Sequence, residues 1–116
     1  MENKEIDELM KKHFDASHSL DLDAFMETWA DDASVEFLVT GRKIEGKEEL
    51  RTAYRDSMFG PLTNLKTEIV HQVAHKNYRT YIERCTECSN ADVVGTEVHW
   101  TLEFRDGKIQ KGWTLQ

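Results

Sequence analysis

The C-terminal part of the chain carries the pattern that most restricts the fold. From residue 94 to residue 104, apolar and polar side chains alternate, which is the period of a β-strand with one buried face. Asp106-Gly107 follows and is a strong signal for a two-residue hairpin turn. This turn places the apolar side chains of both strands on one face, and it predicts the pairs Phe104 with Ile109, Trp100 with Trp113, and Val98 with Leu115.

The first sixty residues show helical spacing instead. A first helix is predicted by apolar residues at helical intervals, with an inner face formed by Ile6, Leu9, Met10, His13 and Phe14. Asp21 is a good N-cap for a second helix, whose inner face holds Leu22, Phe25, Met26 and Trp29. A short strand over 34–39 comes next, and a third helix runs from Gly46 to the stop signal Gly60-Pro61.

Two more strands are predicted between the third helix and the C-terminal hairpin. In the first, the alternation places on one face Leu65, Thr67, Ile69, His71 and Val73. In the second, over 79–88, Tyr81, Glu83 and Cys85 share a face, and the alternation leaves open which face is buried. Three helices followed by long antiparallel strands predict a single α+β domain over 1–116, with the helices covering one face of the sheet. Long strands twist and curl, so a hollow is expected between sheet and helices.

Composition excludes several classes of function. A chain of 116 residues is too short for a second core. Its net charge of −7 argues against nucleic acid or an anionic membrane as a partner, because both require basic surface. No apolar run approaches the ~20 residues of a membrane span, and no signal-peptide pattern is visible. With only 2 cysteines, a cytoplasmic location is expected.

Three short segments are shared with a known group of proteins. They are 30–36 (ADDASVE), 46–50 (GKEEL) and 104–109 (FRDGKI). With the order of the elements, they resemble the nuclear transport factor 2-like superfamily, specifically its SnoaL-like and ketosteroid isomerase-like branch. The resemblance implies a cone-shaped fold that encloses a deep apolar pocket and usually dimerises through the sheet. Such relatives include isomerases, polyketide cyclases, dehydratases, epoxide hydrolases and proteins without chemistry, so the fold alone does not determine the function.

The resemblance can be followed position by position for the ketosteroid isomerases. Phe37 stands where they carry the general-base aspartate, His13 at their oxyanion-hole tyrosine, and Trp100 at their second oxyanion-hole acid. Their supporting tyrosine on the third helix is matched by Tyr54. Because Phe37 cannot act as a base, ketosteroid isomerisation by the usual residues is not expected.

The dehydratase-like relatives have a tyrosine and an aspartate on the first helix and at its exit, where this chain has His13 and His18. Their strand histidine corresponds to His71. If the turn near Asn77 has three residues, His71 lies opposite Glu83 on the pocket side and the two form an acid/base pair. If the turn has two residues, Glu83 faces solvent and the pair is lost. A purely structural cross-strand hydrogen bond is the alternative.

Two further groups of residues have both a functional and a structural interpretation. His13, on the buried face of its helix, either donates a hydrogen bond to a ligand oxygen or is a core histidine bonded to Tyr54 or to backbone. The aromatic residues either line the pocket and bind a planar apolar substrate or fill the hollow themselves. The residues predicted to bind substrate are Phe37, Tyr54, Trp100, Trp113 and Trp29.

No metal site and no cofactor are predicted. Cys85 and Cys88 are three residues apart on a strand, so they point to opposite faces, and no second cysteine pair is present. The functional prediction is a small-molecule-binding protein, either an isomerase, cyclase or dehydratase that acts by proton transfer on a small apolar or aromatic substrate. The catalytic candidates are His71 as the base, Glu83 as the acid that orients it, and His13 as a hydrogen-bond donor. The alternative is a non-catalytic ligand-binding or dimerisation module with an aromatic-filled cavity, and a homodimer is expected in either case.

Overall fold

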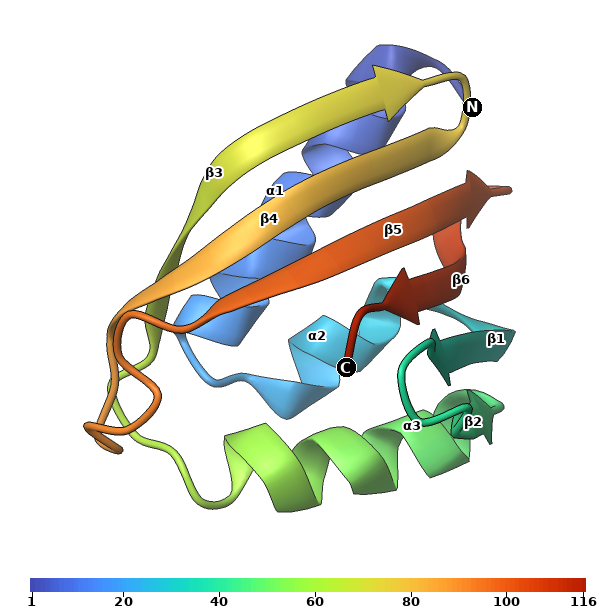
Figure 1. Cartoon of the computed structure of the whole chain (residues 1–116). Helices are drawn as coiled ribbons and strands as arrows, with labels where there is room; N and C mark the ends of the chain where they lie inside the picture. The colour runs from blue at the N-terminus through green and yellow to red at the C-terminus, as the bar shows by residue number, and fades with distance from the viewer.

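The structure, a computed structural model, describes all residues from Met1 to Gln116. Three α-helices, one short π-helix and six strands make up the chain (Figure 1). In chain order the elements are α1 (Asn3–His18), α2 (Leu22–Glu27), β1 (Trp29–Phe37), β2 (Lys43–Glu45), α3 (Lys47–Tyr54), η1 (Arg55–Phe59), β3 (Lys66–His75), β4 (Tyr78–Glu87), β5 (Glu97–Arg105) and β6 (Lys108–Thr114).

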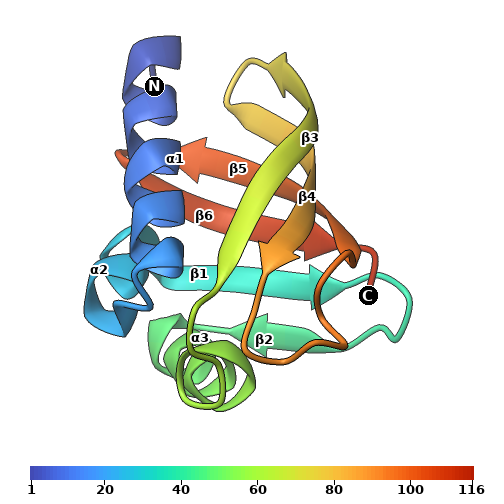
Figure 2. The same ribbon diagram turned by 90° about the vertical axis from the view of Figure 1, so that its left-hand side faces the viewer.

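The six strands form one curved sheet in the order β2-β1-β6-β5-β4-β3. Neighbouring strands are antiparallel except β1 and β6, which are parallel, so the sheet is mixed rather than wholly antiparallel. In Figure 2, β1 and β6 run across the view whereas β3 runs steeply, and α1 and α3 lie beside the hollow side of the sheet. The predicted α+β class, with helices packed on one side of a curved sheet, is confirmed.

The helices follow the predicted pattern except at the end of the second one. It ends at Glu27, so Trp29, predicted on its inner face, is instead the first residue of β1. Asp21 caps α2, accepting a hydrogen bond from the Ala24 backbone N–H at 3.1 Å. The third helix changes at Arg55 into a turn of π-helix that ends at Phe59, and π-turns of this kind often occur near functional sites. None of the helices combines the length and the apolar character that crossing a lipid bilayer requires.

One hydrophobic core joins the helices to the concave face of the sheet. Its members come from every α-helix and from five strands, and they are Ile6, Met10, Ala16, Phe25, Met26, Trp29, Ala33, Val35, Ile44, Leu50, Tyr81, Leu102, Phe104 and Ile109. The alternation predicted for β5 is confirmed within the strand, where Leu102 and Phe104 are buried. The strand begins only at Glu97, so Val94 lies in the preceding loop and is exposed.

A β-bulge in β3 changes the predicted facing of that strand. Ile69 pairs with Glu83, but His71 pairs with Ile82, so Val70 is an extra residue. The turn at Lys76-Asn77 has two residues, since His75 pairs with Tyr78. The bulge keeps Glu83 on the concave face although the turn is short. The predicted pairing of His71 with Glu83 is therefore wrong, because the extra residue turns His71 to the outer, exposed face.

A second bulge has the same effect in β6. Phe104 pairs with Ile109 as predicted, but Glu103 pairs with Lys111, so Gln110 is the extra residue. From that point Thr101, not Trp100, pairs with Trp113. The predicted pairing of the two tryptophans is wrong because the bulge turns Trp113 to the outer face, where its ring centroid lies 6.4 Å from that of Tyr78.

Candidate functional site

A cavity of about 340 Å³ lies between the concave face of the sheet and the helices α1 and α3. It is within the size range of small-molecule sites. Of the 25 residues that line it, 18 are hydrophobic, so polar side chains are few and their positions determine what the cavity can bind. The polar side chains relevant to chemistry are His13, Thr67 and Glu83, and the hydrophobic lining residues add the hydroxyls of Tyr54 and Tyr81 and the thiol of Cys85.

His13 projects from α1 into the cavity wall and is only 6% exposed. Its Nδ1 lies 2.9 Å from Thr28 Oγ1, and the Thr28 hydroxyl donates to the Phe25 carbonyl at 2.7 Å. Because the single hydroxyl proton of Thr28 is used on Phe25, His13 must donate from Nδ1–H, which leaves Nε2 with a free lone pair. Burial lowers the pKa of His13 to about 3, so the ring is neutral. The free nitrogen of His13 is thus an acceptor, opposite to the donor role predicted from the sequence.

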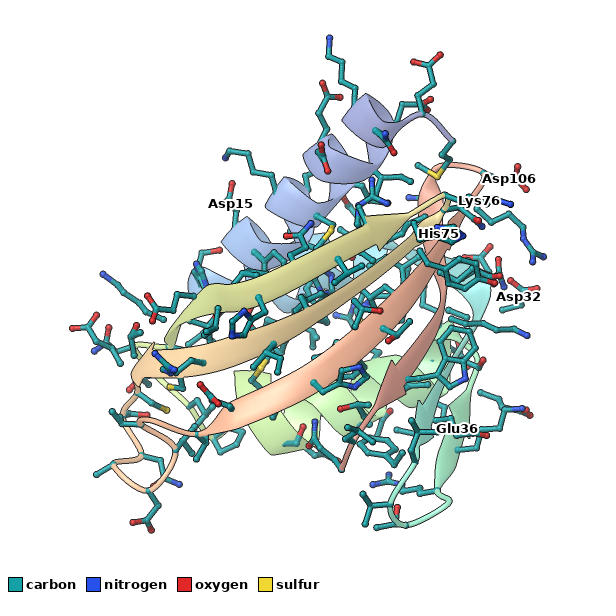
Figure 3. All side chains as sticks on the ribbon, turned by 45° about the horizontal axis from the view of Figure 1, so that its top comes forward. Asp15, Asp32, Glu36, His75, Lys76 and Asp106 are labelled. Atoms are coloured by element: carbon teal, nitrogen blue, oxygen red, sulfur yellow. The ribbon has the colours of Figure 1, made fainter.

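Glu83 is the carboxyl group of the cavity. It lies on β4, and Oε2 accepts a hydrogen bond of 2.6 Å from the Thr67 hydroxyl on β3. Burial raises the pKa of Glu83 above its ordinary value, and the Thr67 hydrogen bond only partly opposes this. By contrast, carboxyl groups labelled in Figure 3, such as Asp15 and Asp32, project outward from α1 and β1 into solvent. A carboxyl whose pKa is raised by burial, on the wall of an apolar cavity, is a candidate for general acid/base chemistry.

Two phenol groups accompany Glu83 on the cavity wall. Tyr54 lies at the end of α3 and Tyr81 on β4, two residues before Glu83. Burial and the nearby Glu83 charge raise the pKa of both phenols, so each stays protonated. No side-chain hydrogen bond within the chain involves either hydroxyl, whereas His13 is bonded to Thr28 and Glu83 to Thr67. Both hydroxyls are therefore free to donate to an oxygen atom of a ligand.

The structure brings together most of the predicted site residues but not all of them. Six line the cavity: His13, Glu83, Phe37, Tyr54, Trp100 and Trp29. His71 and Trp113 do not, because each follows a β-bulge that turns it to the outer face. The aromatic side chains occupy part of the hollow, and Trp29 is fully buried, yet they leave the volume given above empty.

Sequence reasoning missed Thr67, His18 and Tyr81 as site residues. Thr67 and Tyr81 each had one available signal, because the alternation placed them on the same faces as other cavity residues. His18, at the last position of α1, contacts Thr67 across 49 positions of sequence, with 2.8 Å between His18 Nε2 and Thr67 Oγ1. Helical spacing cannot reveal a contact of this kind, although the resemblance to the dehydratase-like relatives had placed His18 at the position of their aspartate.

No group of three or more histidine, cysteine, aspartate or glutamate side chains is arranged to hold a metal ion. Cys85 and Cys88 are free thiols, and Cys85 is buried at the cavity wall. Burial raises the pKa of the Cys85 thiol, which disfavours the reactive thiolate. The groups of the cavity that can exchange or share a proton include Glu83, Thr67, the two phenols and the neutral His13.

Comparison with known proteins gives a consistent result for the fold. The SnoaL-like domain family matches residues 10–111 of the chain. No curated protein matches the sequence significantly. Solved structures that are similar include an NTF-2 like protein of unknown function from Burkholderia xenovorans LB400, with 22% identity and a TM-score of 0.76 over 96% of this chain and 81% of that one.

Two other similar structures cover nearly all of this chain. A SnoaL-like protein of unknown function from Burkholderia thailandensis E264 is 18% identical, with a TM-score of 0.75 over 98% of this chain and 96% of that one. An LEH-like epoxide hydrolase from M. tuberculosis is 19% identical, with a TM-score of 0.75 over 96% of this chain and 81% of that one. At these identities the similarity establishes the fold, whereas the function must be argued from the residues of the cavity.

Proposed function

We propose that this chain, which belongs to the SnoaL-like domain family, binds a small, mostly apolar molecule bearing a carbonyl oxygen and catalyses a proton transfer on it. The observation that carries the proposal is Glu83, a carboxyl with a raised pKa on the wall of an otherwise apolar cavity. Burying a carboxyl costs free energy because burial disfavours its charged form, so a carboxyl in such a place is a candidate for a functional role.

The proposed reaction begins with Glu83 as a base. Its carboxylate removes a proton from the carbon next to the ligand carbonyl, and the electrons of that C–H bond move toward the carbonyl oxygen. The Tyr54 and Tyr81 hydroxyls are the free donors that stabilise the negative charge on that oxygen. Glu83 then returns the proton to another carbon of the same molecule, so the reaction is an isomerisation and needs no further reactant.

The remaining cavity residues support a small apolar ligand rather than a polar one. Phe37, Trp100 and Leu102 line the wall, and aromatic side chains favour flat rings by stacking. His13 contributes an acceptor, Nε2, which suits a ligand hydroxyl or amide N–H. A volume of about 340 Å³ accepts a ligand of one or two rings.

The first test measures turnover and binding together. The β,γ-unsaturated isomer of cyclohexenone is an enolisable ketone small enough for the cavity, and its conversion to the conjugated ketone is followed by ultraviolet absorption. We expect catalysed conversion, with a rate that rises with pH as Glu83 becomes a carboxylate. In parallel, small aromatic ketones should raise the melting temperature by mass action.

The two parts of the proposal are separable in this test. Thermal shifts without turnover of a panel of enolisable ketones would contradict the catalytic part and favour a ligand-binding module. The absence of both would favour the interpretation in which the aromatic side chains merely fill the domain interior.

A homodimer through the outer face of the sheet is also part of the proposal. It is supported by apolar side chains on that face, among them Val73, which is 64% exposed, and the half-buried Trp113. Sedimentation equilibrium measures the mass directly. A monomer at all accessible concentrations would contradict this part without affecting the cavity.

A further inference from the structure

Three polar side chains form a continuous line from the cavity to the surface. Glu83 Oε2 lies 2.6 Å from Thr67 Oγ1, and Thr67 Oγ1 lies 2.8 Å from His18 Nε2. Glu83 lines the cavity, whereas His18 ends α1 and is half-buried. The three residues come from β4, β3 and α1, so the line exists only in the folded chain.

The Thr67 hydroxyl, in the middle of this line, can donate its hydrogen bond in either of two directions. It carries one proton, so it donates either to Glu83 or to His18, and it accepts from the other. When Glu83 is a carboxylate, Thr67 donates to it and His18 donates from Nε2–H. When Glu83 is protonated, it donates to Thr67, and Thr67 donates to an unprotonated Nε2 of His18.

The backbone contact of His18 favours the arrangement in which Nε2 is the acceptor. The Thr67 backbone N–H also points at His18 Nε2, at 3.3 Å, which supports this nitrogen when it is an acceptor. The other ring nitrogen, Nδ1, has no hydrogen-bond partner in the chain and belongs to a half-buried ring, so it can exchange a proton with water. We propose that Thr67 and His18 form a reversible proton path that connects the Glu83 carboxyl with solvent outside the cavity.

Each use of the path moves one proton from Glu83 to water. The Glu83 O–H proton passes to Thr67 Oγ1 while the original Thr67 hydroxyl proton passes to His18 Nε2. His18, already protonated on Nδ1, becomes an imidazolium and then loses its Nδ1 proton to water. The products are the Glu83 carboxylate, an intact Thr67 hydroxyl and neutral His18 protonated on Nε2, and the reverse sequence protonates Glu83.

The surroundings favour the neutral forms at both ends of the path. Burial lowers the pKa of His18, with Asp15 opposing and Lys66 reinforcing the effect. Burial raises the pKa of Glu83, and the groups that face it, Tyr54 and Tyr81, are uncharged. A protonated Glu83 beside a neutral His18 is therefore an accessible state, and it is the state from which the path delivers a proton outward.

This inference rests on the proposed role of Glu83 and adds two positioning residues to it. A ligand that fills the cavity removes water from the cavity side of Glu83. If Glu83 is protonated at that moment, it must lose this proton by another route before it can act as a base, and its only side-chain hydrogen bond within the chain leads through Thr67.

The test follows the tautomer of His18 in the ligand-free protein by ¹⁵N NMR of the ring nitrogens. Where His18 is neutral and Glu83 protonated, we expect the proton on Nδ1. At higher pH, after Glu83 ionises, we expect it on Nε2. The expected result is a change of tautomer that has the same midpoint as the carboxyl ¹³C titration of Glu83. A merely structural Thr67 would hold one tautomer throughout.

Three variants sharpen the result. Thr67→Val has nearly the same shape but no hydroxyl, and it should lose the tautomer change. Thr67→Ser retains the hydroxyl and should keep it. Glu83→Gln cannot ionise, and in this variant His18 should keep one tautomer over the pH range in which the unchanged chain changes tautomer.

The proposal is overturned if His18 of the unchanged chain has the Nε2–H form at every pH at which it is neutral. It is also overturned if Thr67→Val, folded by circular dichroism, shows the same tautomer change as Thr67→Ser. Because no ligand is present, these outcomes are independent of the turnover assay. The proposed enzymatic function can therefore fail while the proton path stands, or the reverse.

Discussion

Two glutamates lie on opposite faces of the same sheet, and their surroundings differ. Glu83 of β4 faces the cavity and has one neutral hydroxyl partner, Thr67. Glu103 of β5 faces outward, accepts a hydrogen bond of 2.8 Å from the Tyr78 hydroxyl, and has the Arg105 guanidinium 3.6 Å away. Glu103 is nonetheless only 7% exposed, so both side chains lose much of their hydration.

The comparison shows that burial alone does not identify a carboxyl as a catalytic base. Glu103 is surrounded by its own strand and hairpin neighbours, with Tyr78 directly opposite in the register, and it adjoins no cavity wall described above. Glu83 lacks a cationic partner and opens onto empty space, and burial raises its pKa. An acidic side chain becomes a candidate base when its stabilising partners are few and a ligand can reach it.

The largest expected difference between the two glutamates concerns catalysis. Glu83→Gln removes the proposed base and should lower the rate of cyclohexenone isomerisation by about 10²–10⁴-fold, the usual contribution of a general base. Glu103→Gln is the matched control, and because it lies outside the cavity it should leave the rate close to that of the unchanged chain. Both variants are assayed at a temperature at which circular dichroism shows them folded.

Equal losses of rate in the two variants would contradict the distinction between the faces. They would indicate that the glutamates act through the stability of the sheet rather than through the chemistry of the cavity.

The next largest effect concerns His13 and acid stability. The pKa of His13 is about 3 in the folded chain and about 6.5 in the unfolded chain, so below pH 6.5 the unfolded state binds a proton that the folded state does not. The stability due to neutral His13 is therefore present above about pH 6.5 and is lost as the pH falls toward 3. We expect the free energy of unfolding to be about 3 kcal/mol lower at pH 4 than at pH 7 from this residue alone.

The matched variants for this prediction are His13→Gln and His71→Gln. His13→Gln does not titrate at this position and should lose this part of the pH dependence in urea unfolding, while His71→Gln, at an exposed position, should retain it. Identical pH profiles for the two variants would show that His13 accepts a proton as easily when folded as when unfolded.

The smallest expected effect is the pH dependence of stability due to Glu83, which is opposite in sign to that due to His13. Because the pKa of Glu83 is raised in the folded chain, its contribution to stability is fully present below its ordinary, unfolded pKa and is lost as the pH rises through the folded value. Glu83→Gln should remove this loss on the alkaline side, whereas Glu103→Gln should keep it. Thermal unfolding between about pH 4 and about pH 8 measures the difference, and a steeper loss in Glu83→Gln would reverse the assignment.

The sequence predicted the parts of this protein that depend on local pattern. Helical spacing identified the inner face of α1, including His13, and period-two alternation identified the inner face of β5, including Trp100 and Leu102. Hairpin chemistry at Asp106-Gly107 gave the correct pairing of Phe104 with Ile109. These signals are readable because each depends on residues within a few positions of one another.

Two single extra residues, Val70 and Gln110, lay beyond the reach of such patterns. A bulge leaves the alternation of residue types almost unchanged but reverses the facing of every later side chain, so His71 and Trp113 were assigned to the wrong side. Likewise, the contact between His18 and Thr67 joins a helix end to a strand 49 positions away, and only the packing of α1 on the curved sheet creates it. The sequence by itself thus determined which elements form and which residues are available, whereas the tertiary structure decided which of them meet at the cavity, because register and long-range packing depend on the whole chain.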